Sequence, residues 1–141
     1  MARRKDKIRL GAFLYPTGHH VAAWRHPDAQ ADAGANFAHY VHLAQTAERG
    51  CFDAVFMADS LGTRGDDMPA LSRVATRYVA QFEPLTLLSG LAAVTEHIGF
   101  IATASTSYNE PYHIARKFAS LDQMSGGRAG TSSPPPTRRR R

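Results

Sequence analysis

The apolar residues of this chain gather into segments that alternate between the period of a strand and the period of a helix. Short apolar runs, each followed by turn-forming or polar residues, fall at 8–15, 52–58 and 98–104. Apolar residues recur at helical spacing over 37–49, 85–96 and 111–124. The pattern predicts β–α–β–α–β–α, and strand spacings of about 45 residues fit the crossovers of a parallel sheet.

Residues that favour helix ends flank the three helical segments. Asn36 can cap the first helix, and Gly50 closes it. A Glu-Pro pair opens each of the other two, at 83–84 and 110–111, because proline suits the first turn and glutamate the positive end of the dipole. Two glycines at 126–127 end the last helix.

The apolar faces of the two later helices can also be assigned. On one side of the second helix lie Leu85, Leu88, Leu91, Ala92 and Thr95. On or near one face of the last helix fall Tyr112, Ala115, Ala119 and Met124, and this face is widened by Ile114, Phe118 and Leu121.

Composition places the chain among ordinary globular proteins. Its 141 residues, 43% apolar and 21% charged, suffice for one domain with a core. No apolar run approaches the roughly 20 residues of a membrane span, and no signal-peptide pattern follows the basic residues at 3–7. The single cysteine excludes an internal disulfide, so we expect a cytoplasmic location. Beside Gly50 and an apolar strand, Cys51 is interpreted as a small buried hydrophobe.

The positive charge is concentrated at the end of the chain. The formal net charge is +5, and the final arginines, 138–141, account for four of these charges. The rest of the protein is nearly neutral, so the charge alone is weak support for nucleic-acid binding.

Polar residues at the carboxyl ends of the strands are the candidate functional residues, because ligands of β/α proteins bind there. Asp59 ends the second strand and could accept hydrogen bonds, or it could be a cap or turn residue. The third strand ends in hydroxyl residues, which could bind a phosphate or heterocycle but are also common in strands: Thr103, Ser105, Thr106 and Ser107. His19 and His20 follow the first strand, and a histidine there could act as general acid or base, or could simply lie on the surface.

Other sites are disfavoured by the spacing of their residues. His39 and His42 lie three apart, but no carboxylate or cysteine completes a zinc set. There is no glycine-rich phosphate loop of the P-loop or Rossmann type. The segment 61–72 is interpreted as a long functional loop, and 73–80 as either a short helix or an extended segment.

Four stretches together resemble the flavin-dependent monooxygenases of the bacterial-luciferase-like family. They are GHHVAAWRHP (18–27), AERGCFDAVFMAD (47–59), FEPLTLLSGLAAVTEHIGF (82–100) and ATASTSYNEPYHIARKFASLDQMSGGRAG (102–130). The resemblance is to the branch that includes nitrilotriacetate monooxygenase component A, dibenzothiophene-sulfone monooxygenase and long-chain alkane monooxygenase.

This resemblance implies α/β architecture in the form of a TIM (β/α)8 barrel, of which the chain holds the first three β/α units. It implies FMN as cofactor, supplied in reduced form by a separate NAD(P)H:flavin reductase. Reduced flavin would react with O2 to give a C4a-peroxyflavin, which oxygenates a small organic substrate. It also implies that the full-length family member is a homo-oligomer, with neither a nucleic acid nor a membrane as partner.

The resemblance also suggests roles for individual residues. Asp59 matches a flavin-contacting aspartate at the second strand. Thr106 matches the flavin-contacting position at the third strand, with Ser105 and Thr103 as neighbours. His19 matches a histidine on the substrate side of the flavin and is the catalytic candidate.

The match runs from about Ile8 to Gly130, and after Ala-Gly the family continues with Trp-Asn and a fourth strand; the departure begins near Arg128. Here prolines 134–136 follow and the tail has no apolar residue, which predicts disorder. Written in common GC-rich codons, the family's Gly-Trp-Asn-Leu-Val-Thr-Ser becomes residues 129–135 of this chain when it is read one base later. The hypothesis is therefore a frameshift.

We expect three parts on this basis: a basic segment (1–7), a partial barrel domain (8–130) and an out-of-frame tail (131–141). The chain would be an N-terminal fragment, inactive alone, whose third strand is an open edge. The alternatives are a non-catalytic module that binds through its basic tail, and a relative that uses the deazaflavin F420.

Overall fold

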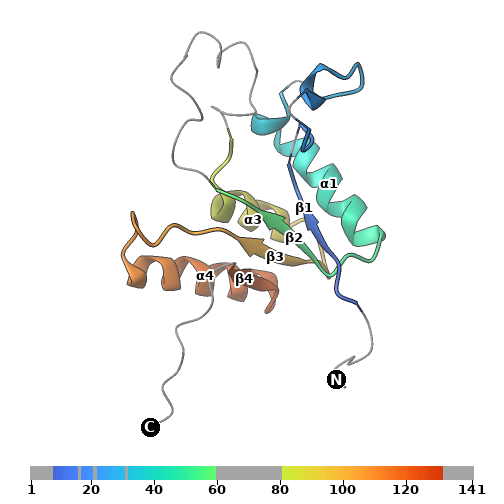
Figure 1. Ribbon diagram of the computed structural model, residues 1–141. Coiled ribbons are helices and arrows are strands. Elements are labelled where there is room, and N and C mark those ends of the chain that lie inside the picture. Colours follow the sequence, from blue (N-terminus) through green and yellow to red (C-terminus); the bar gives the residue numbers. More distant parts are fainter. Residues whose placement is uncertain (1–7, 16, 21, 31, 60–80, 132–141) are drawn as a thin grey trace.

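The computed structural model (Figure 1) describes residues 8–15, 17–20, 22–30, 32–59 and 81–131. The element order is β1 (Gly11–Phe13), η1 (Ala23–Arg25), η2 (Ala33–Ala35), α1 (Phe37–Arg49), β2 (Ala54–Met57), α3 (Pro84–Ala92), β3 (Gly99–Ala102), α4 (Pro111–Ser125) and β4 (Ala129–Thr131). Our expectations for segments 1–7, 61–72 and 73–80 and for the tail from 132 onward lie outside the described residues. None of the described helices is long and apolar enough to cross a membrane.

The strands form one parallel sheet in the order β1-β2-β3-β4. The predicted alternation of strands and helices is confirmed, although each strand is shorter at both ends than its apolar run. Only the residues that pair with a neighbour count as strand, so β1 keeps three residues of the predicted 8–15. The sheet therefore matches the predicted α/β class.

The expectation that the sheet stops at the third strand is wrong. Residues 129–131 form β4, which pairs in parallel with β3, and Thr131 lies opposite Ala102. Prolines 134–136 cannot pair in a strand interior, but the pairing uses the three residues directly after Arg128, none of which is proline. Of the strands that the structure describes, the outer one on this side is therefore β4 rather than β3, and it crosses the expected boundary between 130 and 131.

The helix boundaries follow local capping chemistry. The side chain of Asn36 accepts a hydrogen bond of 3.0 Å from the backbone N–H of His39, and α1 runs over the predicted residues. Glu83 caps α3 by accepting from the backbone N–H groups of Leu85 and Thr86 at 3.0 and 2.7 Å. α3 ends at residue 92, four residues before its predicted end.

The packing of α4 differs from the prediction. The residues expected on its apolar face, Tyr112, Ala115, Ala119 and Met124, are all exposed. The helix packs instead through the flanking positions that we had placed at the border of that face: Leu121 is buried, and Ile114 and Phe118 are half-buried. Ser125, one turn after Leu121, is also buried.

The expectation for Cys51 is also wrong, because its side chain is exposed. This residue has φ = 59°, in the left-handed region, at the turn between α1 and β2. The turn carries its side chain away from the apolar strand that follows.

The predicted inner side of α3 is confirmed, since its four apolar positions and Thr95 are all buried.

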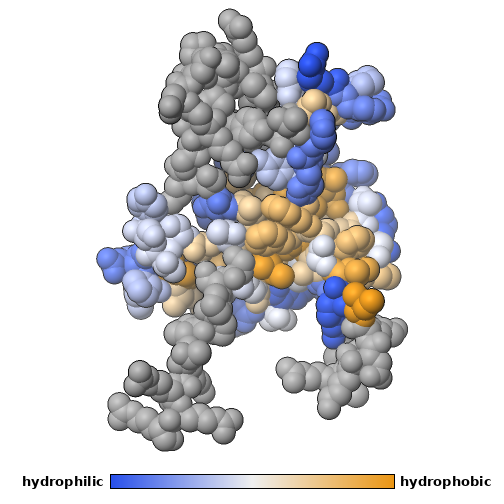
Figure 2. All heavy atoms as spheres, in the orientation of Figure 1, coloured by the Kyte–Doolittle hydropathy of each residue, from blue (hydrophilic) through white to orange (hydrophobic). Residues whose placement is uncertain are grey.

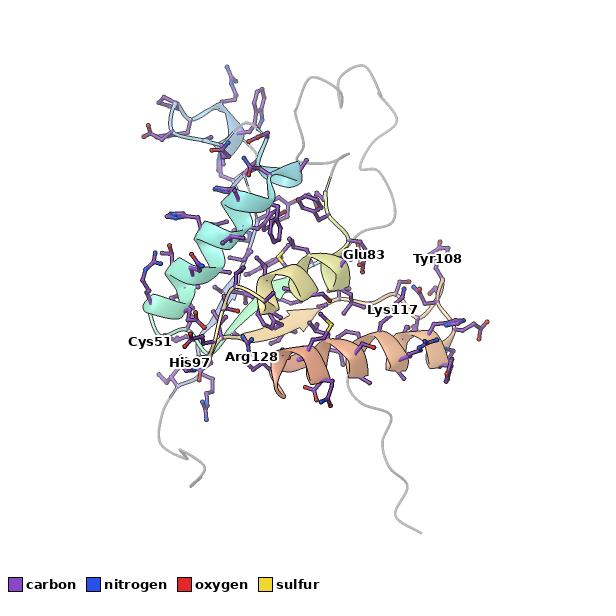
Figure 3. All side chains as sticks on the ribbon, turned by 180° about the vertical axis from the view of Figure 1, so that it is seen from behind. Cys51, Glu83, His97, Tyr108, Lys117 and Arg128 are labelled. Carbon is purple, nitrogen blue, oxygen red and sulfur yellow. The ribbon has the colours of Figure 1, made fainter. Side chains whose placement is uncertain are left out.

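Among the described residues, helices cover one face of the sheet and not the other. The rows Ala12–Val55–Phe100–Ala129 and Met57–Ala102–Thr131 share the first face. In Figure 3, seen from behind, the helices lie in front of this face, and Val55 and Phe100 are fully buried there. Figure 2 shows apolar side chains gathered on the opposite side, over the strands that face the viewer in Figure 1.

Charged side chains brace the amino ends of the strands. The Glu48 carboxylate on α1 accepts hydrogen bonds from three successive backbone N–H groups, those of Glu96, His97 and Ile98, at 2.9, 2.6 and 3.0 Å. These residues lead into β3, so one carboxylate ties the first helix to the third strand. Asp53, before β2, accepts from the backbone N–H of Leu10, before β1, at 2.9 Å.

The positively charged side chain of Arg128 holds the last β/α unit in place through hydrogen bonds to backbone carbonyls. Its guanidinium donates to the carbonyls of Ala92, Thr95 and Ile98 at 3.0, 3.0 and 2.9 Å. It also donates to the Thr95 hydroxyl at 3.1 Å. The Cζ atom of Arg128 lies 5.0 Å from the centre of the Phe100 ring. Arg128 therefore supplies donors to the carbonyls around the end of α3 and fixes the start of β4.

Candidate functional site

The polar residues predicted as a site follow three neighbouring parallel strands at the same edge of the sheet. Thr103 comes directly after β3, and its backbone N–H donates to the carbonyl of Met57, the last residue of β2, at 3.0 Å. Asp59 follows β2 by two residues. The side chains of Asp59, Thr103 and Ser105 are all half-buried at this edge.

The rest of the hydroxyl cluster is more open to solvent. Thr106 and Ser107 are exposed. The loop that carries them is held by the Asn109 side-chain amide, which donates to the Ser105 carbonyl at 3.0 Å. The hydroxyl groups therefore span the range from half-buried, next to the sheet, to exposed, at the tip of the loop.

His19 folds back against β1. Its Nε2 lies 3.1 Å from the Phe13 carbonyl oxygen, which can only accept, so Nε2 carries the proton of this bond. Its ring centre is 4.8 Å from that of Phe13 and 5.3 Å from that of Tyr15. The hydrogen bond and the two aromatic contacts fix the orientation of the imidazole near the carboxyl end of β1, the strand that it follows in the sequence.

The Phe13 ring extends this aromatic group across the uncovered face. Phe13 pairs in register with Phe56 on β2, and their ring centres are 4.9 Å apart. Phe56 in turn lies opposite Ile101 on β3. An apolar floor therefore runs across three strands, with His19 at one end and the polar strand ends at its border.

Thr17 is a candidate that the sequence analysis missed. Its side chain is only 5% exposed, and its hydroxyl is the one buried side-chain polar atom without a hydrogen-bond partner among the residues that the structure describes. It lies in the turn after β1, where the Gly18 N–H donates to the Tyr15 carbonyl at 2.8 Å. We read the Pro-Thr-Gly segment only as a turn, because nothing in its sequence signals that the hydroxyl is buried.

Tyr40 is a buried residue of helix α1. It is 1% exposed, and its ring centre is 5.9 Å from that of Phe82. Burial, with a smaller contribution from Tyr15, raises the pKa of the Tyr40 phenol to about 12. Tyr40 is therefore a neutral residue of the packed layer at ordinary pH.

A groove lies on the helix side of the sheet. This groove between α3 and α4 has a volume of about 520 Å3 and is lined by Glu83, Leu85, Thr86, Ser89, His113, Arg116, Lys117 and Ser120. Burial raises the pKa of the Glu83 carboxyl, but hydrogen bonds from Thr86 and Leu85 and the nearby Lys117 charge lower it more, so the net shift is downward. The hydroxyls of Ser89 and Ser120 already donate to carbonyls of their own helices, which leaves the groove with few uncommitted hydroxyl donors.

Comparison with known proteins gives consistent matches. Residues 17–137 match the family model of luciferase-like monooxygenases. The chain is 57% identical over 130 residues to N-acetyl-S-(2-succino)cysteine monooxygenase of Bacillus subtilis (strain 168), covering 92% of this chain and 28% of the relative. It is 42% identical over 129 residues to nitrilotriacetate monooxygenase component A of Aminobacter aminovorans, covering 88% of this chain and 28% of the relative.

The fold matches solved structures over the same region. A crystal structure of riboflavin lyase with modified FMN and riboflavin superposes with a TM-score of 0.78 at 31% identity, covering 89% of this chain and 29% of that chain. The chain thus spans somewhat over a quarter of the length of the relatives it matches.

Proposed function

Because the chain belongs to the luciferase-like monooxygenase family, we propose that it forms part of the oxygenase component of a two-component monooxygenase that uses reduced FMN. The observation that carries the proposal is the 57% identity, over 92% of the chain, to a monooxygenase. The relative named as component A of a monooxygenase supports the two-component form. The partners would be a flavin reductase, O2 and a small organic substrate.

The residues at the strand ends fit the ring system of a flavin. The isoalloxazine ring has an edge of alternating carbonyl and N–H groups and a broad apolar surface. In our proposal the Asp59 carboxylate and the hydroxyls of Thr103, Ser105 and Thr106 bind that edge. The buried hydroxyl of Thr17, which has no partner in the part of the chain that the structure describes, also fits a ligand able to hydrogen-bond, because leaving it unpaired costs free energy.

The protein's own task is to hold and shield this ring. When bound, reduced FMN supplies the electrons that activate O2. The half-buried position of Asp59 and Thr103 and the adjoining aromatic residues suit a site from which water is excluded. We assign His19 to the substrate side, where its orientation is fixed by the hydrogen bond to the Phe13 carbonyl.

The four-stranded sheet by itself offers only part of such a site. Within the described ranges, each outer strand pairs on one side only, and no helix covers the apolar face of the sheet. We therefore propose that the 141-residue chain alone neither binds FMN tightly nor turns over substrate.

A chimera tests the proposed function. Residues 8–131 of this chain would replace the matching region of the Bacillus subtilis relative. The chimera would then be assayed with N-acetyl-S-(2-succino)cysteine, FMN, NAD(P)H and a flavin reductase. We expect oxygenation that requires both FMN and the reductase. A folded chimera that binds no flavin and shows no oxygenation would contradict the proposal.

A further inference from the structure

We propose that the groove between α3 and α4 binds a ligand that carries a sugar phosphate. Its cationic wall, formed by His113, Arg116 and Lys117 on α4, holds the phosphate group, and hydroxyl oxygens in the same groove accept hydrogen bonds from the sugar. None of the strand-end residues assigned to the flavin lines this groove. The proposal therefore goes beyond the proposed function and does not depend on it.

The size and the lining of the groove suit a small molecule rather than a single ion. Its volume is about 520 Å3, and ligand sites typically measure roughly 300–1,000 Å3. Its lining includes Leu85, which is only 8% exposed and gives the groove an apolar part. Figure 3 shows Glu83 and Lys117 on the two helices that form its walls. The groove can therefore accommodate a sugar phosphate between two helices of the described chain.

The cationic wall has no counter-charge among the described residues. Arg116 and Lys117 lie three and four positions after His113 on α4, so the three side chains reach the same groove. Neither Arg116 nor Lys117 forms a salt bridge with an acidic group in the part of the chain that the structure describes. Two cations that converge on one groove repel each other, and a bound anion relieves this repulsion. A phosphate group suits them, because it accepts from guanidinium and ammonium donors at once.

The carboxylate of Glu83 does not supply the missing counter-charge, because it is committed to the start of α3. One oxygen accepts from the backbone N–H of Leu85 at 3.0 Å. The other accepts from the backbone N–H and from the hydroxyl of Thr86, both at 2.7 Å. These bonds also occupy the amino end of α3, so the side chains of α4 must hold the anionic group of a ligand.

The hydroxyl groups of the groove are set as acceptors. Ser89 and Ser120 donate to carbonyls of their own helices at 2.8 and 2.9 Å, and Thr86 donates to the Glu83 carboxylate. A hydroxyl has one proton and two acceptor positions, so each of these oxygens can still accept a hydrogen bond. An ionised phosphate has no proton to offer them, whereas the hydroxyl groups of a sugar do. Donors and acceptors in one groove therefore select a ligand that carries both an anion and hydroxyl groups.

Titration of the whole chain tests the proposal. Ribose 5-phosphate, inorganic phosphate and ribose would each be added at one ionic strength, with binding followed by calorimetry and by backbone amide NMR signals. We expect ribose 5-phosphate to bind at least tenfold more tightly than inorganic phosphate, with shifts in α3 and α4, and ribose not to bind. Titration with AMP separates the two sources of a sugar phosphate, because tighter binding of AMP indicates a nucleotide and weaker binding a free sugar phosphate.

Two pairs of substitutions separate the parts of the groove. Arg116→Gln combined with Lys117→Gln should weaken binding of both phosphate compounds at least tenfold, because the cations that hold the phosphate are lost. Ser89→Ala combined with Ser120→Ala should reduce the affinity for ribose 5-phosphate to that for inorganic phosphate, and leave the latter unchanged. Arg25→Gln, at an exposed arginine on η1, is the control and should change neither affinity.

The contrary results are specific. Equal affinities for ribose 5-phosphate and inorganic phosphate would overturn the proposal, because charge alone would then attract the ligand. Binding that survives the loss of both Arg116 and Lys117 would place the ligand elsewhere and overturn it as well. If the chain alone does not fold, the same titrations and variants in the chimera with the Bacillus subtilis relative give the answer. A chimera that binds ribose 5-phosphate in the groove but shows no oxygenation would count against the proposed function only.

Discussion

Arg128 and Thr95 are joined by two hydrogen bonds: Nη1 donates to the Thr95 hydroxyl at 3.1 Å and Nη2 donates to the Thr95 carbonyl at 3.0 Å. Thr95 follows α3 and Arg128 precedes β4, so the pair ties two consecutive β/α units together. The Thr95 hydroxyl also donates a hydrogen bond of its own, to the Leu91 carbonyl at 2.8 Å.

Removing this guanidinium should destabilise the chain strongly. Arg128→Met leaves the carbonyls of Ala92, Thr95 and Ile98 without their donor, and we expect a loss of about 2–4 kcal/mol in the free energy of unfolding. Arg128→Lys should recover only a small part, because an ammonium group cannot reach the same set of acceptors. Urea denaturation measures both, with Arg116→Met, at an exposed position on α4, as control. A loss below 0.5 kcal/mol for Arg128→Met would contradict this role.

Glu48 should make stability dependent on pH in the acid range. Burial raises the pKa of its carboxyl, but the backbone N–H groups of His97, Ile98 and Glu96 lower it more, to below its ordinary value of 4.5. The unfolded chain therefore binds a proton at higher pH than the folded chain does. The contribution is complete above about pH 5 and is lost as the pH falls through the folded-state pKa.

The variant Glu48→Gln should remove this dependence. We expect it to lower the unfolding free energy near neutral pH by about 1 kcal/mol, at the low end for hydrogen bonds to a charge because the site is partly solvated. The gap from the unmodified chain should close as the pH falls through the lowered folded-state pKa of Glu48. Glu96→Gln, at an exposed side chain, is the control. A gap of constant size from pH 7 to pH 3 would count against the ionised carboxylate.

Replacing Thr17 should stabilise the chain. Thr17→Val keeps the shape and removes a buried hydroxyl that has no hydrogen-bond partner among the described residues, so we expect a gain of about 1 kcal/mol. Thr17→Ser retains the hydroxyl and should give no gain. Thermal and urea unfolding compare the two. Destabilisation by Thr17→Val would mean that the hydroxyl is satisfied in the folded protein.

The Tyr40 phenol should lose its proton only at a pH well above that of a free tyrosine, and its ionisation should accompany unfolding. Its pKa is raised by burial to about 12, from an ordinary value of 10.0. Stability from this group is complete below pH 10 and is lost as the pH rises through 12, because the unfolded phenol ionises first. Absorbance of the tyrosinate should show this step, and Tyr40→Phe should remove it. A Tyr40 signal that titrates near pH 10 in the folded chain would contradict its burial.

The sequence predicted what local chemistry decides. Asn36 and Gly50 bound α1, and the Glu-Pro pairs open α3 and α4, because capping involves only neighbouring residues. Parallel order followed from the spacing of strands and helices. The residue types at the strand ends indicated where a site should lie.

The sequence could not predict what distant contacts decide. The packed stripe of α4 is set by the elements it contacts, so helical periodicity centred the predicted face on residues such as Tyr112 and Met124, with Leu121 only at its border and Ser125 outside it. Glu48 contacts residues about fifty positions away, a separation at which no local pattern gives a signal. β4 is held by the edge of β3 and by Arg128, contacts that the residue types at 129–131 do not signal.

Binding of FMN tests the central proposal most directly. Equilibrium dialysis would compare the chain alone, the chimera with the Bacillus subtilis relative, and the chimera carrying Asp59→Ala or, as control at an exposed loop aspartate, Asp28→Ala. We expect no stoichiometric FMN on the chain alone, one FMN on the chimera, at least tenfold weaker binding with Asp59→Ala, and no change with Asp28→Ala. Stoichiometric FMN on the chain alone, or a folded chimera whose affinity ignores Asp59→Ala, would contradict the proposed site.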